Sequence, residues 1–77
     1  MVCAPRDTIL DKLTNQFKET RRSFGLQGTA AVFEIYASQQ GTWTMIMTQT
    51  TGVTCVLAAG DAWSEEKSAL LVEGDPT

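Results

Sequence analysis

The stretch that decides the fold runs from Ala31 to Ala59 and reads AVFEIYASQQGTWTMIMTQTTGVTCVLAA. Apolar side chains recur at every second position, and two short polar segments that each contain a glycine interrupt the pattern. Connections this short can join only neighbouring antiparallel strands. The stretch therefore predicts a three-stranded antiparallel β-meander, with strands at about residues 29–38, 42–49 and 53–59.

The residues before this stretch predict one helix, at about residues 5–23. Pro5 suits the first turn of a helix, and Gly25 suits the position just after its end. The apolar stripe of this helix consists of Ile9, Leu10, Leu13 and Phe17. A single helix can bury such a stripe only on the sheet, so the expected fold class is α+β, an N-terminal helix packed on the meander.

We expect one domain at about residues 1–63, because 77 residues are too few for two cores. Residues 64–77 form a C-terminal extension, which fits either a short helix capped by Ser64 or a tail. The expected core joins the helix stripe to one face of the sheet. Its members are Leu10, Leu13, Phe17, Phe33, Ile35, Trp43, Met45 and Leu57.

Composition and charge exclude several classes of function. The chain has six Lys and Arg against nine Asp and Glu, no His, and a net charge of −3, which does not suit a nucleic-acid binder. Without His, the usual general base and the commonest metal ligand are both missing. No apolar run approaches the roughly 20 residues that span a bilayer. We therefore expect no catalytic, cofactor-binding or metal site, no nucleic-acid or membrane partner, and no small-molecule substrate.

Cys3 and Cys55 are candidates for a disulfide. Such a bond would tie the start of the helix to the last strand and close a loop of about 50 residues, which the chain-entropy model values at roughly 4 kcal/mol. The alternative is that Cys55 is a small buried hydrophobe and Cys3 a free thiol in a reducing compartment.

Residues 35–60 contain no charged side chain. Free-standing sheets normally protect their outer face and edges with charges, so an uncharged face is expected to be covered. The predicted interaction face consists of Tyr36, Thr42, Thr44, Ile46, Thr48, Thr54 and Val56. Its cover is either a protein partner or a second copy of the chain, or else the C-terminal segment with Leu70, Leu71 and Val72. Glu34 alternates onto the same face and is expected to be a solvent-facing charge.

Several short segments resemble a group of small alphaproteobacterial proteins of uncharacterised function. The similarity covers about residues 3–63, through the segments CAPRD at 3–7, EIYAS at 34–38, GTWT at 41–44 and GVTCVLAAG at 52–60. Members of that group usually follow a secretory signal peptide. The resemblance therefore implies a periplasmic, oxidised domain in which Cys3 and Cys55 are paired, and it implies no activity.

The chain differs from that group in two ways. It starts at Met1-Val2 without the basic and apolar segments of a signal peptide, and it has additional residues at 64–77. A copy without a signal fits a bacteriophage protein, whose virion meets an oxidising medium after lysis. Our leading hypothesis is a non-enzymatic structural or accessory subunit that acts by protein–protein contact in an assembly, most specifically a phage virion. The alternative is a free periplasmic, disulfide-stabilised binding module of unknown ligand.

Overall fold

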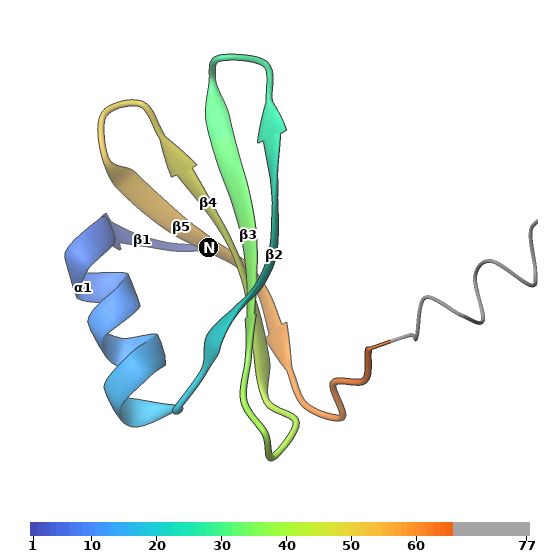
Figure 1. Ribbon diagram of the computed structural model, residues 1–77. Coiled ribbons are helices and arrows are strands. Elements are labelled where there is room, and N and C mark those ends of the chain that lie inside the picture. Colours follow the sequence, from blue (N-terminus) through green and yellow to red (C-terminus); the bar gives the residue numbers. More distant parts are fainter. Residues whose placement is uncertain (66–77) are drawn as a thin grey trace, which may run out of the picture.

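The computed structural model describes residues 1–65 and shows an antiparallel sheet with one helical segment against one face (Figure 1). The sheet has five strands, in the order β1-β5-β4-β3-β2. In chain order the elements are β1 (Val2–Pro5), α1 (Arg6–Asp11), the π-helical η1 (Lys12–Gln16), β2 (Thr20–Gln27), β3 (Ala31–Ala37), β4 (Trp43–Gln49) and β5 (Val53–Gly60).

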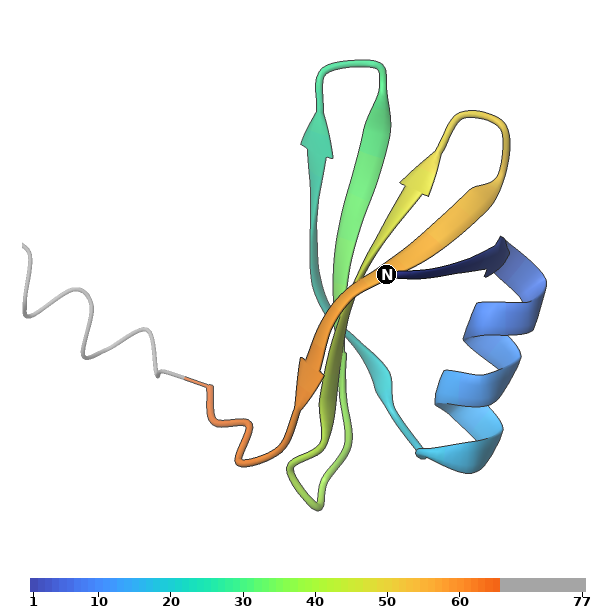
Figure 2. The ribbon, with the colours of Figure 1, turned by 180° about the vertical axis from the view of Figure 1, so that it is seen from behind.

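The helical segment crosses the sheet from one edge to the other. β1 and β2 are consecutive strands, yet they form the two opposite edges. The connection between them therefore has to pass over β5, β4 and β3, and α1 with η1 makes this crossing on one face only (Figure 2). Strands β2 to β5 follow one another as a simple antiparallel meander.

The predicted fold class was wrong. The protein is mostly β, and the sheet has two strands more than the three-stranded meander that the pattern indicated. The additional strands are β1, which pairs with β5, and β2, which pairs with β3. The predicted C-terminal extension at residues 64–77 lies outside the described residues beyond Glu65.

The helix ends much earlier than the predicted residue 23, at Gln16. Lys18 has a φ of 58°, a left-handed conformation that breaks the helical path, and the backbone N–H of Glu19 donates to the carbonyl of Leu13 at 2.9 Å. The positions three and four residues after Phe17 are Thr20 and Arg21, so no apolar stripe continues to hold a helix on the sheet. The chain gains its backbone hydrogen bonds from β3 instead.

The core lies between the helical segment and the sheet. Ile9 and Leu13 of the helical segment pack with Tyr36 of β3 and Ile46 of β4, and Ile46 is fully buried. Three partly buried residues extend this cluster: Ala4, Leu10 and Val56. This core uses the even-numbered side chains of β3 and β4, because side chains alternate between the faces of a strand.

The faces of the sheet were therefore assigned the wrong way round. Four residues of the predicted interaction face are buried on the helix side, namely Tyr36, Thr44, Ile46 and Thr54, and three are half-buried, namely Thr42, Thr48 and Val56. Arg6, at the first position of the helix, pairs with Glu34 on this face. Glu34 is 1% exposed and is not the solvent-facing charge that was predicted.

The other face carries the bulkier side chains that were predicted as core. We call it the open face, and it consists of Phe33, Ile35, Met45, Met47 and Ala58, which lie opposite one another in the strand register. No part of residues 1–65 lies over it as a second layer (Figures 1 and 2). Phe33, Ile35 and Met45 are half-buried, while two other predicted core residues, Phe17 and Leu57, are 41% and 37% exposed.

Candidate functional site

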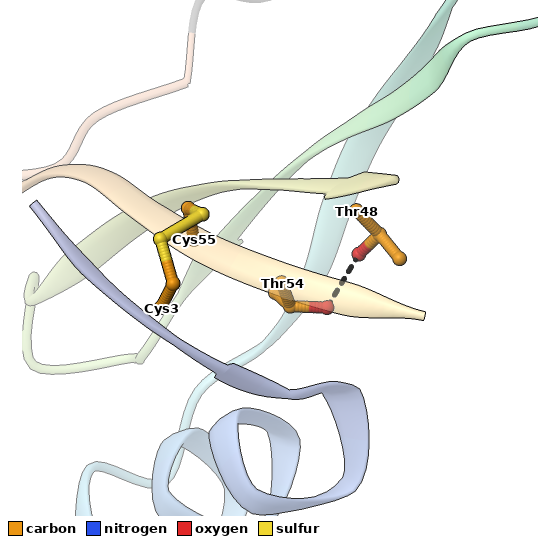
Figure 3. Close-up of a disulfide and its surroundings, with 4 residues drawn as sticks. All are labelled: Cys3, Thr48, Thr54 and Cys55. Carbon is orange, nitrogen blue, oxygen red and sulfur yellow. Dashed lines mark hydrogen bonds between the residues drawn. A yellow bond between two sulfur atoms is a disulfide. The ribbon is translucent and has the colours of Figure 1, made fainter. Parts of the chain in front are cut away.

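The predicted disulfide between Cys3 and Cys55 is present (Figure 3). The two residues lie directly opposite each other where β1 pairs with β5, and their Cα atoms are 3.9 Å apart. The bond fixes the four-residue strand β1 at the edge of the sheet. Because α1 begins at Arg6, it also fixes the start of the helix.

A polar network centred on Glu34 lies under the helix start. Arg6 binds the Glu34 carboxylate through both terminal nitrogens, with Nη1 2.6 Å from Oε1 and Nη2 3.0 Å from Oε2. Arg21 of β2 donates to Oε2 at 3.2 Å, and the Tyr36 hydroxyl donates to the same oxygen at 3.3 Å. Glu34 thereby connects the helix start, near one edge of the sheet, to β2 at the other edge.

Threonine hydroxyls continue the network along the sheet. Arg6 Nη1 also donates to the Thr48 hydroxyl at 3.0 Å, and the hydroxyls of Thr48 and Thr54 are 2.8 Å apart (Figure 3). Thr54 is fully buried. The hydroxyls of Thr48 and Thr54 therefore satisfy buried polar groups inside the domain.

The network shifts the pKa values of its members in the directions expected for a closed ion pair. Hydrogen bonds from Arg6 lower the pKa of Glu34 in spite of its burial, and Arg21 adds to the same effect. Burial raises the pKa of the Tyr36 hydroxyl, and the neighbouring Glu34 carboxylate raises it further. Glu34 is thus a carboxylate and Tyr36 a neutral donor at neutral pH.

This arrangement suits structure better than catalysis. The Glu34 carboxylate receives four hydrogen bonds, two of them from Arg6, and it is 1% exposed. Through its bonds to Arg6 and Arg21, Glu34 holds the start of α1 and β2 on the sheet.

The open face presents paired apolar side chains from neighbouring strands. Its register places Phe33 opposite Met47 and Ile35 opposite Met45, in two adjacent pairs. At one end of the open face, the indole of Trp43 packs against Gly60. A Cβ atom added at Gly60 would lie only 3.0 Å from Nε1 of Trp43. The Trp43 ring is 6.4 Å from that of Trp63, which extends the aromatic surface beyond the sheet.

Sequence reasoning did not find Arg6 and Arg21 as partners of Glu34. They lie 28 and 13 residues from it in the chain, so no local pattern connects them. Within residues 1–65, no group of three or more His, Cys, Asp or Glu side chains is placed to hold a metal ion. In the same part of the chain, no helix is both long and apolar enough to cross a membrane.

The fold and its disulfide define a small, mostly β domain, in which residues 1–65 cover one face of the sheet and leave the other without a second layer. A scan against protein-family models found no match, and neither did searches of curated proteins and of solved structures.

Proposed function

We propose that the chain is a non-enzymatic structural or accessory subunit that acts by protein–protein contact, with a second copy of itself seated on the open face. The observation that carries the proposal is this face. It presents Phe33, Ile35, Met45 and Met47 side by side, with no second layer over them within the described part of the chain. Domains normally bury such a face against another layer.

Charge favours a second copy as the occupant. The chain has a net charge of −3, so two copies repel each other at most surfaces. Residues 35–60 contain no charge, and they supply most of the open face. Two copies can meet there without placing like charges opposite each other, which would cost free energy.

The size of the sheet is sufficient for a weak, specific contact. Strands of seven residues are about 23 Å long, and five strands are about 24 Å wide. Two such faces in contact bury on the order of 1,000 Å² in total, which is near the lower limit for a specific interface. Weak contacts of this size suit a subunit that assembles in many copies.

The disulfide supports an oxidising location for the assembly, because such bonds are rare in a reducing cytosol. The most specific candidate is a bacteriophage virion; the alternative is the periplasm, which the resemblance of the segments at 3–7 and 41–44 implies. Capsid and tail genes beside the coding sequence would favour the virion. A host operon encoding an exported form would favour the periplasm.

The test is the molar mass in solution of the wild type and of two lysine variants. Met45→Lys places a charge in the centre of the open face, and Thr14→Lys places the same charge on the exposed helix surface as a matched control. We expect size-exclusion light scattering to show dimers or larger species for the wild type and Thr14→Lys at about 1 mM, and monomers for Met45→Lys. Circular dichroism checks that both variants fold.

A wild type that is monomeric at about 1 mM would overturn the proposal, because even a dimer with a free energy near −4 kcal/mol is substantially formed there. A folded Met45→Lys variant that associates as strongly as the wild type would overturn it as well. In that case the contact uses another surface.

A further inference from the structure

A cavity of about 380 Å³ lies between the helical segment and the sheet, on the face opposite the open face. Its wall is mainly apolar and includes Ile9, Leu13, Val56 and Ala59. Small-molecule sites in proteins commonly have volumes of about 300–1,000 Å³ and mostly apolar walls with a few polar groups. The cavity meets this description in size and in lining.

Glu19 is the acidic residue in that wall, and one oxygen of its carboxylate lacks a hydrogen-bond partner. The residue is 2% exposed, and its Oε1 atom makes no hydrogen bond within the part of the chain that the structure describes. Its backbone is fixed, because its N–H donates to the carbonyl of Leu13 and the preceding Lys18 is left-handed. Burying an unpaired carboxylate costs several kcal/mol, so this position needs an explanation.

The cations nearby do not supply the missing partner. All three arginines contact other carboxylates: Arg6 and Arg21 bind Glu34, and Arg22 binds Glu65. Lys12 also lines the cavity, but it is exposed and forms no ion pair with Glu19 in residues 1–65. The site therefore combines an apolar wall with one buried carboxyl group that forms no ion pair within residues 1–65.

We propose that this cavity binds a small amphiphile with an apolar body and an ammonium head group. The ammonium would donate to Glu19, and the apolar body would lie against Ile9, Leu13 and Val56. Charge complementarity selects this class over neutral or anionic amphiphiles, since a charge-assisted hydrogen bond in a dry site is stronger than a neutral one. The proposal is independent of the open face, which lies on the other side of the sheet.

The first experiment compares three probes of equal chain length on the oxidised wild-type protein. Isothermal titration calorimetry is run with n-hexylammonium, 1-hexanol and hexanoate. We expect n-hexylammonium to bind at least about tenfold more tightly than either of the others. Amide chemical shifts in NMR spectra should change at Ile9, Leu13 and Val56 and stay constant at Phe33 and Met45 of the open face.

Two pairs of variants locate the site. Glu19→Gln keeps the shape of the side chain and removes its charge, and Glu65→Gln makes the same change at an exposed carboxylate outside the cavity. Ala59→Phe adds bulk to the cavity wall, and Ala58→Phe adds the same bulk on the open face. We expect Glu19→Gln and Ala59→Phe to weaken n-hexylammonium binding at least about tenfold, and the two controls to change it less than about twofold.

Thermal unfolding separates a binding role from a structural one. If the Glu19 carboxylate has no partner in the free protein, Glu19→Gln should leave the unfolding temperature unchanged or raise it. A lower unfolding temperature would mean that the carboxylate stabilises the fold, and it would overturn the proposal. Equal affinity for the three probes, no binding of n-hexylammonium, or binding that is unaffected by Glu19→Gln would each overturn it too.

Discussion

Replacing Arg6 by Gln should destabilise the protein far more than the same change at Arg21, although both arginines bind Glu34. Arg6 makes two hydrogen bonds to the carboxylate, and its side chain is 34% exposed. Arg21 makes one, at 3.2 Å, and its side chain is 50% exposed. Arg6→Gln therefore removes more of the contacts to the buried Glu34 carboxylate than Arg21→Gln does.

The size of the effect follows from what remains around Glu34. Removing one partner of a fully buried pair costs about 3–5 kcal/mol. Arg6 is partly exposed to solvent, and Arg21 remains as a second cation beside Glu34. The expected loss of stability for Arg6→Gln is therefore smaller, about 2–3 kcal/mol. An exposed pair is worth about 0–1 kcal/mol, which is the expectation for Arg21→Gln. Domains of this length have a total stability of about 4–12 kcal/mol, so the first loss is large.

The assay is urea unfolding of both variants and the wild type at neutral pH and again near pH 3. The pKa of Glu34 is lower in the folded state than in the unfolded state. Its pairing therefore stabilises the fold fully above the unfolded pKa, and this contribution is lost as the pH falls through the folded pKa. The difference between the wild type and Arg6→Gln should shrink accordingly in acid.

Two results would refute this reasoning. Equal losses of stability for Arg6→Gln and Arg21→Gln at neutral pH would show that the two-bond contact of Arg6 contributes no more to the free energy of unfolding than the single bond of Arg21. A difference between wild type and Arg6→Gln that is the same at both pH values would show that Arg6 acts through packing and not through the charge of Glu34.

Two further predictions concern the disulfide and the core. The Cys3–Cys55 bond joins residues 52 apart, so its reduction should lower the free energy of unfolding by about 4 kcal/mol. Urea titrations with and without reductant measure this difference. Equal unfolding midpoints under the two conditions would contradict the prediction. Leu13→Ala should cost about 2–5 kcal/mol because Leu13 is 4% exposed, whereas Phe17→Ala should cost less than about 1.5 kcal/mol because Phe17 is 41% exposed. Equal costs for the two changes would show that the helix packs differently.

The sequence predicts the central strands of the sheet but not its edges. β3, β4 and β5 carry a clear period-two pattern, and short turns separate them. β1 has four residues and includes Pro5, which is too short for any periodic signal. β2 begins with Thr20 and two arginines, and these residues resemble the polar end of a helix when Gly25 follows.

The two faces of the sheet could not be assigned correctly from local pattern. The odd positions of β3 and β4 are almost all apolar, whereas the even positions include Glu34, Thr44 and Thr48, so alternation favours the odd set as the face that meets the helix. Glu34 appeared to mark the outer face because charges are rarely buried without a partner. Its partner, Arg6, lies 28 residues earlier in the chain, and only the fold brings the two together.

The disulfide was predictable for a different reason. A chain of 77 residues with two cysteines has one intramolecular pairing available, and a domain this small gains much from it. The register of β1 and β5 then places the two residues opposite each other. Glu19, in contrast, could not be recognised as a candidate binding residue, because the sequence pattern places it inside a predicted helix among polar neighbours.

The edge position of β1 has a consequence for the order in which the chain folds. The meander from β2 to β5 forms through contacts between neighbouring strands, whereas β1 must wait for β5, the last of the described strands in chain order. Closing that long loop is the slow, entropically costly step. Among the described strands, β1 should thus be the last to be placed, and oxidation of Cys3 should mark the completion of the sheet. In refolding from reduced, urea-unfolded protein, the sheet signal in circular dichroism should return before Cys3 loses its reactivity toward maleimide.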